Sequence, residues 1–275
     1  MRFSALFSDQ GSVEIFNKCI GAVSHLSKKK CAIKITPAGM CFICNTTTGV
    51  NSKDGDYWCG VLIAYSPTFL SYSFAGLAED KNEIILEINV DDLARCLQYN
   101  QHNSPKIKLA NKNNSPHLRV ELRQMNIVHD IPVTIIQSRK WPLYDCPSMD
   151  EIQCCLYLPP TRVLLRVLKS LKNTHTKYVS LRANNEGELQ LHAAMKHGEC
   201  NVFFTDLQNE TIANPNTEQQ WIETKLHVKP LHEFFNQFSF THSRIKLSLL
   251  SSRMAEFSVC QEEFEVSFVL GEIRE

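Results

Sequence analysis

The sequence has no long hydrophobic run and no excess of charge of either sign. None of its 275 residues lies in a stretch approaching the roughly 20 consecutive apolar residues that a membrane-spanning helix needs. The first residues, MRFSALFSDQ, contain one Arg and no apolar core, so we expect no secretory signal. Lys and Arg number 29, as do Asp and Glu, so the net charge is zero. Tight sequence-reading DNA binders have a basic excess, so any nucleic-acid contact here must come from segregated charge.

The sequence also lacks the short motifs of common enzyme and DNA-reading families. It contains no phosphate-binding loop, no nucleophile elbow and no dinucleotide-binding fingerprint. Zinc fingers, homeodomains and basic zippers are missing as well. The 11 cysteines stand singly or in close pairs among strand and helix patterns, which without a secretory signal indicates reduced, mostly buried thiols.

Two small groups remain as candidates for chemistry. Cys41 and Cys44 form a C-x-x-C, but residues three apart on a strand face opposite sides, and no second pair lies at zinc-site spacing. His129 and Asp130 are acid–base residue types without a nucleophile nearby in the pattern. We therefore predict no catalytic residues, no metal and no cofactor, with a Cys/His enzyme kept as the alternative from another functional class.

The sequence does contain an internal repeat. LARCLQYNQHNSPKIKL begins at Leu93, LHEFFNQFSFTHSRIKL begins at Leu231, and both end in Ile-Lys-Leu, so the two copies are offset by 138 residues (231 − 93). Each copy reads as a short amphipathic helix, a polar turn and the start of a strand. The offset is about half the chain, far above the period of solenoid repeats, and indicates a duplicated domain.

The hydrophobic pattern predicts two helices and several strands in each half. One helix of each half is the one that begins the repeat copy. The first half has a helix with apolar positions at Phe16, Ile20, Val23 and Leu26, and strands at 3–7, 31–36, 40–44, 57–63, 83–88, 106–110, 117–123 and 127–136. The second half has a helix at 162–172 and strands at 155–158, 178–182, 188–194, 200–205, 221–228, 245–250, 255–260 and 264–270.

The stretch 137–152, QSRKWPLYDCPSMDEI, interrupts both patterns with two prolines and mixed charge. We therefore predict one domain at 1–136, a connector at 137–152 and a second domain at 153–275. The predicted fold class is α+β, with two helices laid on one face of the strands in each domain.

One predicted helix face is cationic. Arg162, Arg166, Lys169 and Asn173 are spaced by four, three and four residues, which places them on one solvent-facing stripe that no acidic residue interrupts. Cations aimed at a phosphate backbone provide weak, salt-dependent attraction that does not depend on base sequence. For any one of these residues, ordinary solvated surface charge is the competing interpretation.

Two further groups of cations lie at predicted helices. Arg95 points away from the apolar face of the helix that begins the first repeat copy. Lys28, Lys29 and Lys30 close the first helix, where positive charge also suits the negative end of the helix dipole.

Several stretches spread over most of the chain resemble the DNA sliding clamp family, and within it the Hus subunit of the heterotrimeric nine-one-one checkpoint clamp. The strands after Leu250 match poorly. The stretches that carry the resemblance are Arg2-Phe3 with Asp9, CAIKITPAGMCFIC (31–44), YWCGV (57–61), NEIILEINVDDLARCL (82–97), VHDIPV (128–133), LYLPPTRVLLRVLKSLKN (156–173), NNEGELQL (184–191) and FTDL (204–207).

The resemblance implies a DNA-clamp fold, with two duplicated domains that each have antiparallel sheets outside and two helices on the inner face of a ring. It implies a non-catalytic subunit of a heterotrimer that encircles DNA at damage sites and is a scaffold for checkpoint signalling and repair. The implied partners are two paralogous clamp subunits, duplex DNA, a clamp-loader ATPase and checkpoint and repair proteins, in the nucleus with a cytoplasmic pool. A homotrimeric replication-type clamp is the alternative.

The resemblance also assigns roles to residues. Gln98 and Gln237 stand where replicative clamps tend to have lysine, which implies a weaker grip on DNA. The implied DNA-facing residues are Arg95, Arg162, Arg166, Lys169, Lys28, Lys29 and Lys30. The implied subunit-interface strands contribute Ile127, Val128, His129, Ile131, Val133, Ile135, Cys200, Val202, Phe203 and Phe204. The implied groove for partner peptides beside the connector is lined by Ile136, Trp141 and Leu143.

Overall fold

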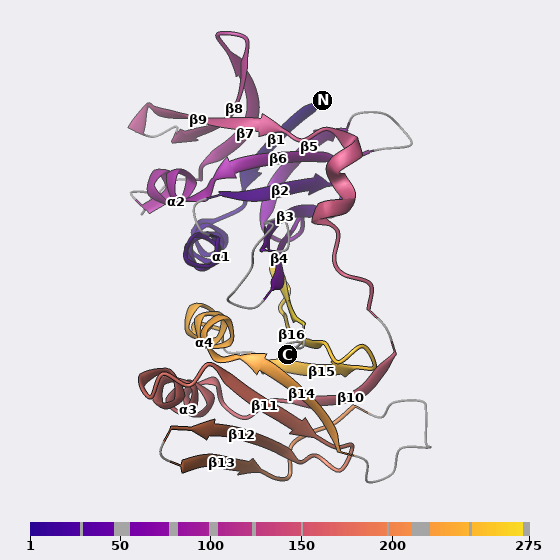
Figure 1. Cartoon of the computed structure of the whole chain (residues 1–275). Coiled ribbons are helices and arrows are strands. Elements are labelled where there is room, and N and C mark those ends of the chain that lie inside the picture. The colour runs from indigo at the N-terminus through magenta and orange to yellow at the C-terminus, as the bar shows by residue number, and fades with distance from the viewer. Residues whose placement is uncertain are drawn as a thin grey trace. The chain divides into compact units, whose positions relative to one another are not determined.

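The structure is a computed structural model that describes residues 1–27, 30–46, 56–76, 82–98, 104–122, 125–149, 151–196, 198–210, 221–241 and 244–271. The chain divides into two compact units, each made of antiparallel strands with two helices (Figure 1). Unit 1 is formed mainly by Met1–Asn45 and Gly60–Asp145, and unit 2 mainly by Cys146–Val259. The division at Asp145 falls inside the predicted connector.

Unit 1 begins with a strand and a long helix and ends with a hairpin and a further strand. Its elements are β1 (Arg2–Phe7), α1 (Gln10–Leu26), β2 (Lys30–Thr36), β3 (Gly39–Asn45), β4 (Tyr57–Ala64), β5 (Phe69–Ala75), β6 (Ile84–Asn89), α2 (Val90–Gln98), β7 (Lys106–Lys112), β8 (Ser115–Leu122) and β9 (Ile127–Ile135), followed by the 3-10 helix η2 (Ser138–Tyr144).

Unit 2 repeats this order, with one strand fewer among its described residues. Its elements are β10 (Ile152–Tyr157), α3 (Thr161–Asn173), β11 (Tyr178–Ala183), β12 (Leu189–Met195), β13 (Gly198–Phe204), β14 (Ile222–His227), α4 (Val228–Gln237), β15 (Lys246–Leu250), β16 (Ala255–Cys260) and β17 (Phe264–Leu270). Residues of β4 and of β17 are divided between the two units.

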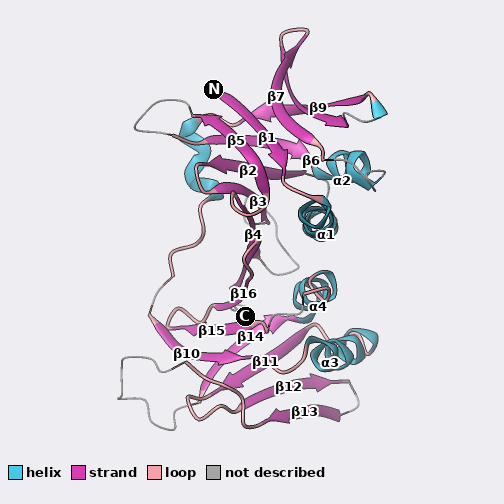
Figure 2. Cartoon of the chain, turned by 180° about the vertical axis from the view of Figure 1, so that it is seen from behind, coloured by secondary structure: helices cyan, strands magenta, loops and turns pink. Residues whose placement is uncertain are grey.

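Antiparallel pairing runs through unit 1 in the order β5-β1-β7-β8-β9-β6-β2-β3. The β7–β8 hairpin turns at Asn113 and Asn114, whose φ angles of 52° and 60° suit a two-residue hairpin turn. In unit 2, β13-β12-β11-β14 form one sheet, and β10, β15, β16 and β17 follow one another in the other. Helices α1 and α2 lie side by side in unit 1, as α3 and α4 do in unit 2 (Figure 2).

The duplication is visible at the level of single residues. Ile84 and Ile222, which begin β6 and β14, are offset by 138 (222 − 84), and so are Val90 and Val228, which begin α2 and α4. The pairing of β2 with β6 and of β11 with β14 has the same register, because Lys34 lies opposite Ile85 as Arg182 lies opposite Glu223. The predicted domain duplication is therefore a duplication of strand pairing as well as of element order.

The two units differ in one strand. Unit 1 has β5 between β4 and β6, whereas unit 2 has no strand between β13 and β14 among the described residues. Strand β5 of unit 1, which the sequence pattern did not predict, pairs with β1 along its length. Its sequence FLSYSFA alternates Leu70, Tyr72 and Phe74 with Ser71, Ser73 and Ala75, so a strand signal is present that the prediction missed. In unit 2 the described residues at the corresponding place form only an isolated bridge, Leu156 opposite Asn209.

A short polar segment replaces that strand in unit 2. The amide of Tyr157 donates to Gln208 and the amide of Glu210 donates to Cys155, at 2.8 and 3.2 Å. The Glu210 carboxylate accepts from the Tyr157 hydroxyl at 2.7 Å and pairs with Lys246 at 3.3 Å. Because of these bonds, the edge of β10 is covered without a full strand.

Helix α1 shows how local chemistry fixes a boundary. Asp9 caps its N-terminus, because its carboxylate accepts from the Ser12 amide at 2.8 Å. This backbone hydrogen bond lowers the pKa of Asp9. Of the helices in the described ranges, none combines the length and apolar composition required to cross a bilayer.

Phenylalanine side chains form the core of unit 2. Phe234 on α4 stacks on Phe268 with 4.4 Å between ring centroids, and both are fully buried. Phe238 and Phe257 pack against the Phe234 ring at 5.2 and 6.0 Å. Offset and edge contacts of this kind add to the free energy gained from burying each ring. The anchoring of α4 therefore depends on Phe234.

We predict that Phe234→Ala lowers the free energy of unfolding by about 3–5 kcal/mol, because it leaves a ring-sized cavity under α4. Chemical denaturation followed by circular dichroism checks this value. The matched control is Phe203→Ala on β13, which is 63% exposed and should stay within roughly 0.5 kcal/mol of the wild type. An equal loss in both variants would contradict the assigned core.

Candidate nucleic-acid and subunit interfaces

Helix α3 presents three cations on one exposed face. Arg162, Arg166 and Lys169 are exposed, while Leu164 and Leu168 on the opposite face are buried. Within the described residues, no carboxylate lies at ion-pair distance from any of the three cations. The predicted stripe therefore has the accessibility and the free charge that a phosphate-binding surface requires.

Helix α4 packs beside α3, and the α3 lysines affect the titration of His232 on α4. His232 is half-buried, and its Nδ1 has no hydrogen-bond partner among the described residues. Burial, together with the charges of Lys172 and Lys169, lowers the pKa of His232. The imidazole is therefore neutral at physiological pH and adds no charge to the α3 face.

The other predicted DNA-facing cations are engaged with acids or lie elsewhere. Arg95 forms an ion pair with Asp92 and donates to the Asp91 carbonyl, so part of its charge is used within α2. Lys30 pairs with Glu87 at 2.7 Å across β2 and β6. Lys28 and Lys29 lie outside the described residues. Of the predicted set, the α3 cations are thus the ones that the structure brings together.

Strand β13 is the outer strand of its sheet. It pairs with β12 over Gly198–Phe204, and within the described ranges no strand lies on its other side. Phe203 is 63% exposed, whereas Cys200, Val202 and Phe204 are half-buried. A row of unpaired backbone groups beside an exposed aromatic ring suits pairing with a strand of another chain.

Strand β9 is open along only part of its length. Ile127 to Pro132 pair with β8, while Val133 to Ile135 pair with β6 on the other side. The side of the strand that Ile127–Ile131 leave open is therefore already paired at Val133 and Ile135, which narrows the predicted interface on β9 to Ile127–Ile131. In this part Val128 is 54% exposed and Ile131 is buried.

An ion cluster that the sequence reading did not identify braces this part of β9. The Asp130 carboxylate accepts from Arg119 Nε at 2.6 Å and from its terminal nitrogen at 3.2 Å, and Lys112 Nζ lies 2.9 Å away. These cations hold the pKa of Asp130 far below its ordinary value. Asp130, considered from the sequence for acid–base work with His129, is bound in a structural ion pair. The sequence pattern did not reveal this ion pair, because it depends on the pairing of β8 with β9, which places Arg119 opposite Asp130.

The connector begins as a tightly held segment. Ile136 is buried, and the Trp141 indole nitrogen donates to its carbonyl at 2.9 Å. Asn45 donates to the Leu143 carbonyl at 2.8 Å, and Lys34 pairs with Asp145 at 3.3 Å. Of the three predicted groove residues, Leu143 is the exposed one, at 54%.

The buried cysteines are poor nucleophiles. Burial raises the pKa of Cys19, Cys44 and Cys154 to about 12 in each case, so these thiols stay protonated at neutral pH. Within the described ranges, no group of three or more His, Cys, Asp or Glu side chains is arranged to hold a metal ion.

Comparisons with known proteins agree on one family and one fold. The family model described as "Hus1-like protein" matches residues 1–273. Checkpoint protein HUS1 of Homo sapiens is 25% identical over 98% of this chain and 99% of that protein. Checkpoint protein Hus1-like of Drosophila melanogaster is 26% identical over 79% of this chain and 80% of that protein.

Among solved structures, the Proliferating Cellular Nuclear Antigen of Entamoeba histolytica superposes with a TM-score of 0.72. It covers 99% of both chains at 14% sequence identity. This superposition over nearly the whole chain confirms the predicted clamp fold.

We predict that Asp130→Asn flattens the acid side of the stability profile. A carboxylate whose folded pKa lies below its ordinary 3.8 stabilises the folded state at higher pH, and this contribution is lost as the pH falls below about 4. Chemical denaturation at a series of pH values measures the slope. Asp145→Asn, which removes a longer and more exposed ion pair, should keep the wild-type slope. An unchanged slope in Asp130→Asn would contradict the assignment.

Proposed function

Because the chain belongs to the Hus1-like protein family, we propose that it is a non-catalytic subunit of a heterotrimeric ring that encircles duplex DNA. The ring acts at damage sites as a scaffold for checkpoint signalling and repair. Two relatives that align with most of this chain are named checkpoint proteins. The proposed partners are two paralogous clamp subunits, a clamp-loader ATPase, and checkpoint and repair proteins. The proposed location is the nucleus, with a cytoplasmic pool.

The observation that carries the proposal is that β13 and the first part of β9 each have one edge without a strand partner among the described residues. In unit 1 the Ala64 amide donates to the Glu263 carbonyl at 2.9 Å, and in unit 2 Tyr57 packs on Phe268 at 5.4 Å. Within each unit, β4 residues thus contact the β17 region. By element order, β13 is the counterpart of β4, and β9 is the counterpart of β17. Within the chain, β4 contacts the β17 region. This supports an equivalent contact between subunits, made by β13 of one subunit and β9 of another.

The charge distribution supports a DNA-facing role for α3. With zero net charge, the chain has little long-range attraction for DNA, but Arg162, Arg166 and Lys169 form a local cationic face. Gln98 and Gln237 are the last residues of α2 and α4, and uncharged side chains there fit a loose grip. A ring of three such subunits holds DNA by enclosure, so weak contacts that permit sliding are sufficient.

The composition of the ring is tested by light scattering on the purified chain, alone and co-expressed with the two candidate partner subunits. The proposal expects a monomer alone and a one-to-one-to-one trimer with partners. A homotrimer formed by the chain alone would favour a replication-type clamp instead. A monomer that ignores both partners would overturn the ring and leave the fold.

We predict that Phe203→Glu on β13 and Val128→Glu on β9 each prevent ring assembly. A charge buried without a partner at a strand–strand contact is strongly unfavourable, and both side chains are exposed in the isolated subunit, so folding should survive. Co-expression followed by size-exclusion chromatography measures assembly. Leu70→Glu on β5, equally drastic and 69% exposed, should assemble normally. Intact rings from either interface variant would show that the edge is wrongly assigned.

We predict that Arg166→Glu combined with Lys169→Glu weakens DNA binding by the assembled ring at least about 10-fold at low salt and reduces the salt dependence, because two phosphate contacts are lost. Fluorescence anisotropy with a labelled duplex gives both values. The matched control reverses two exposed cations of η2, Arg139→Glu with Lys140→Glu. Equal weakening in the two double variants would mean that overall charge, not the α3 face, controls binding.

A further inference from the structure

His232 lies where the two helices of unit 2 meet. Helix α4 packs against α3 (Figure 2), and the His232 side chain on α4 is half-buried. Its Nδ1 atom is buried and has no hydrogen-bond partner among the described residues. A carboxylate or carbonyl bonded to a ring nitrogen fixes the protonation state of a histidine. Because Nδ1 has no such partner in the described chain, solvent access and nearby charges control the protonation of His232.

The nearby charges are two lysines of α3. Burial lowers the pKa of His232 below the ordinary 6.5, and the positive charges of Lys172 and Lys169 lower it further. Both lysine side chains are exposed, and within the described ranges no carboxylate lies at ion-pair distance from either of them. The protein without DNA therefore holds a neutral His232 beside two cations whose charge is not offset by an acid.

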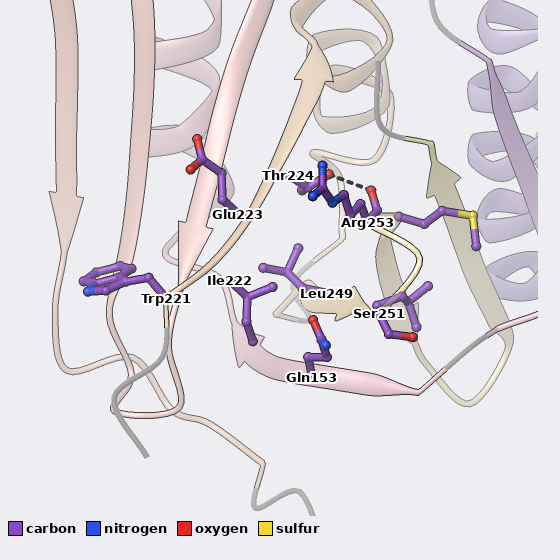
Figure 3. A pocket seen from close by; sticks show the side chains of 10 residues that line it. Gln153, Trp221, Ile222, Glu223, Thr224, Leu249, Ser251 and Arg253 are labelled. Carbon is purple, nitrogen blue, oxygen red and sulfur yellow. Dashed lines mark hydrogen bonds between the residues drawn. The ribbon is translucent and has the colours of Figure 1, made fainter. Parts of the chain in front are cut away.

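Strand β14 also packs against α4 but directs its charged side chains elsewhere. Thr224 and Leu226 are buried and alternate with residues on the outer face of the strand. Figure 3 shows this alternation: the Thr224 hydroxyl turns toward the Arg253 carbonyl, 2.7 Å away, whereas Glu223 lies on the other side of the strand. The charged and titratable residues on the outer face are Glu223, Lys225 and His227.

The remaining neighbours of His232 are uncharged or belong to α4 itself. Phe257 of β16 and Phe268 of β17 pack against Phe234 of α4. On α4 the charged residues are Lys229, three residues before His232, and Glu233, directly after it. The charges that shift the pKa of His232 come from α3.

Lys169 connects His232 with the proposed DNA-facing surface. In the stripe Arg162, Arg166 and Lys169 it is the last member, and Lys172 follows about one helical turn later. Lys169 therefore acts on His232 and also lies on the face that we expect to contact phosphates. A phosphate bound at Lys169 comes within electrostatic reach of the imidazole.

A bound phosphate opposes the effect of the lysines. Its negative charge offsets the charge of Lys169, so the pKa of His232 is higher in the complex than in the protein without DNA. A group whose pKa rises on binding takes up a proton, and by linkage the binding is tighter at low pH. The extra affinity is lost as the pH rises through the pKa that His232 has in the complex.

We propose that His232 belongs to the DNA-facing surface of unit 2 and takes up one proton from solvent when duplex DNA binds to the α3 face. The inference rests on the proposed function, because it takes Lys169 as a phosphate contact. The proposed ring contains one copy of this chain, so this site takes up at most one proton per ring. At neutral pH the uncharged imidazole leaves the contact weak, and acidification tightens it.

Fluorescence anisotropy of the assembled ring with a labelled duplex, at constant low salt, tests the linkage. The measured quantity is the ratio of the Kd at about pH 8 to the Kd at about pH 5.5. The proposal expects this ratio to be at least about threefold larger for the wild type than for His232→Gln, whose amide cannot take up a proton.

The matched control is His192→Gln. His192 is also half-buried in unit 2, but it lies on β12 between the buried Leu191 and Ala193 and so points away from the core. Its Nδ1 lies 2.8 Å from Asn201 Oδ1. This variant should keep the wild-type ratio. The same ratio in the wild type and His232→Gln, or an equal reduction in both variants, would overturn the proposal.

A spectroscopic measurement follows the imidazole directly. Rings in which only this subunit carries ¹³C-labelled histidine are titrated by NMR with and without duplex, and the signal that is missing in His232→Gln identifies the residue. The proposal expects the duplex to raise the pKa of His232 by at least about 0.5, the equivalent of a threefold change in affinity. A pKa that does not rise when the duplex binds would overturn it.

The outcomes separate this inference from the proposed function. A ring that binds no duplex at any pH would overturn both. A ring that binds duplex with the same pH dependence in the wild type and His232→Gln would overturn the role of His232 alone and leave the proposed function standing.

Discussion

A β-strand exposes one row of backbone donors and acceptors on each side, and both rows must be bonded to other groups. In this chain each edge finds a different solution. A full strand, β5, covers β1 in unit 1. A short polar segment around Asn209 covers β10 in unit 2. Strand β13 and the first part of β9 have no such cover within the described residues. The proposed assembly follows from this difference, since an edge that is left open can be completed by another chain.

Charged side chains likewise divide into those that are paired within the subunit and those that remain available. The acids and cations balance in number, yet many of the acids are held by cations on neighbouring strands. Asp130 is bound to Arg119 and Lys112, and Glu87 to Lys30. Helix α3 has no acid on its outer face, so Arg162, Arg166 and Lys169 remain available. A neutral chain can therefore present a local phosphate-attracting surface without the strong, long-range field that would oppose movement along DNA.

Comparison of the two units is informative because the duplication is imperfect. Where the register is shared, as for Lys34–Ile85 and Arg182–Glu223, one unit serves as a reference for the other. Where the described residues differ, an edge is covered in another way: β1 pairs with the full strand β5, whereas β10 has only the bridge to Asn209.

The sequence by itself determined the duplicated domain, the helices at 161–173 and 228–237, and the cationic stripe on the former, because helical periodicity is a local property that neighbouring residues carry in full. The prediction missed β5 although FLSYSFA has the alternation and the aromatic residues of a strand, and the pairing of this strand with β1 is visible only in the structure. Nor did it determine that Arg95 and Lys30 are bound to acids while Arg166 has no such partner among the described residues. It also did not determine that the backbone of Val133 and Ile135 is paired with β6 while that of Val128 is paired only with β8. Arg95 and Asp92 lie three residues apart on α2, and their ion pair depends on side-chain conformation, which periodicity does not specify. Lys30 and Glu87 are 57 residues apart, and β6 meets β9 over a similarly long stretch of chain, so only the tertiary structure decides these pairings.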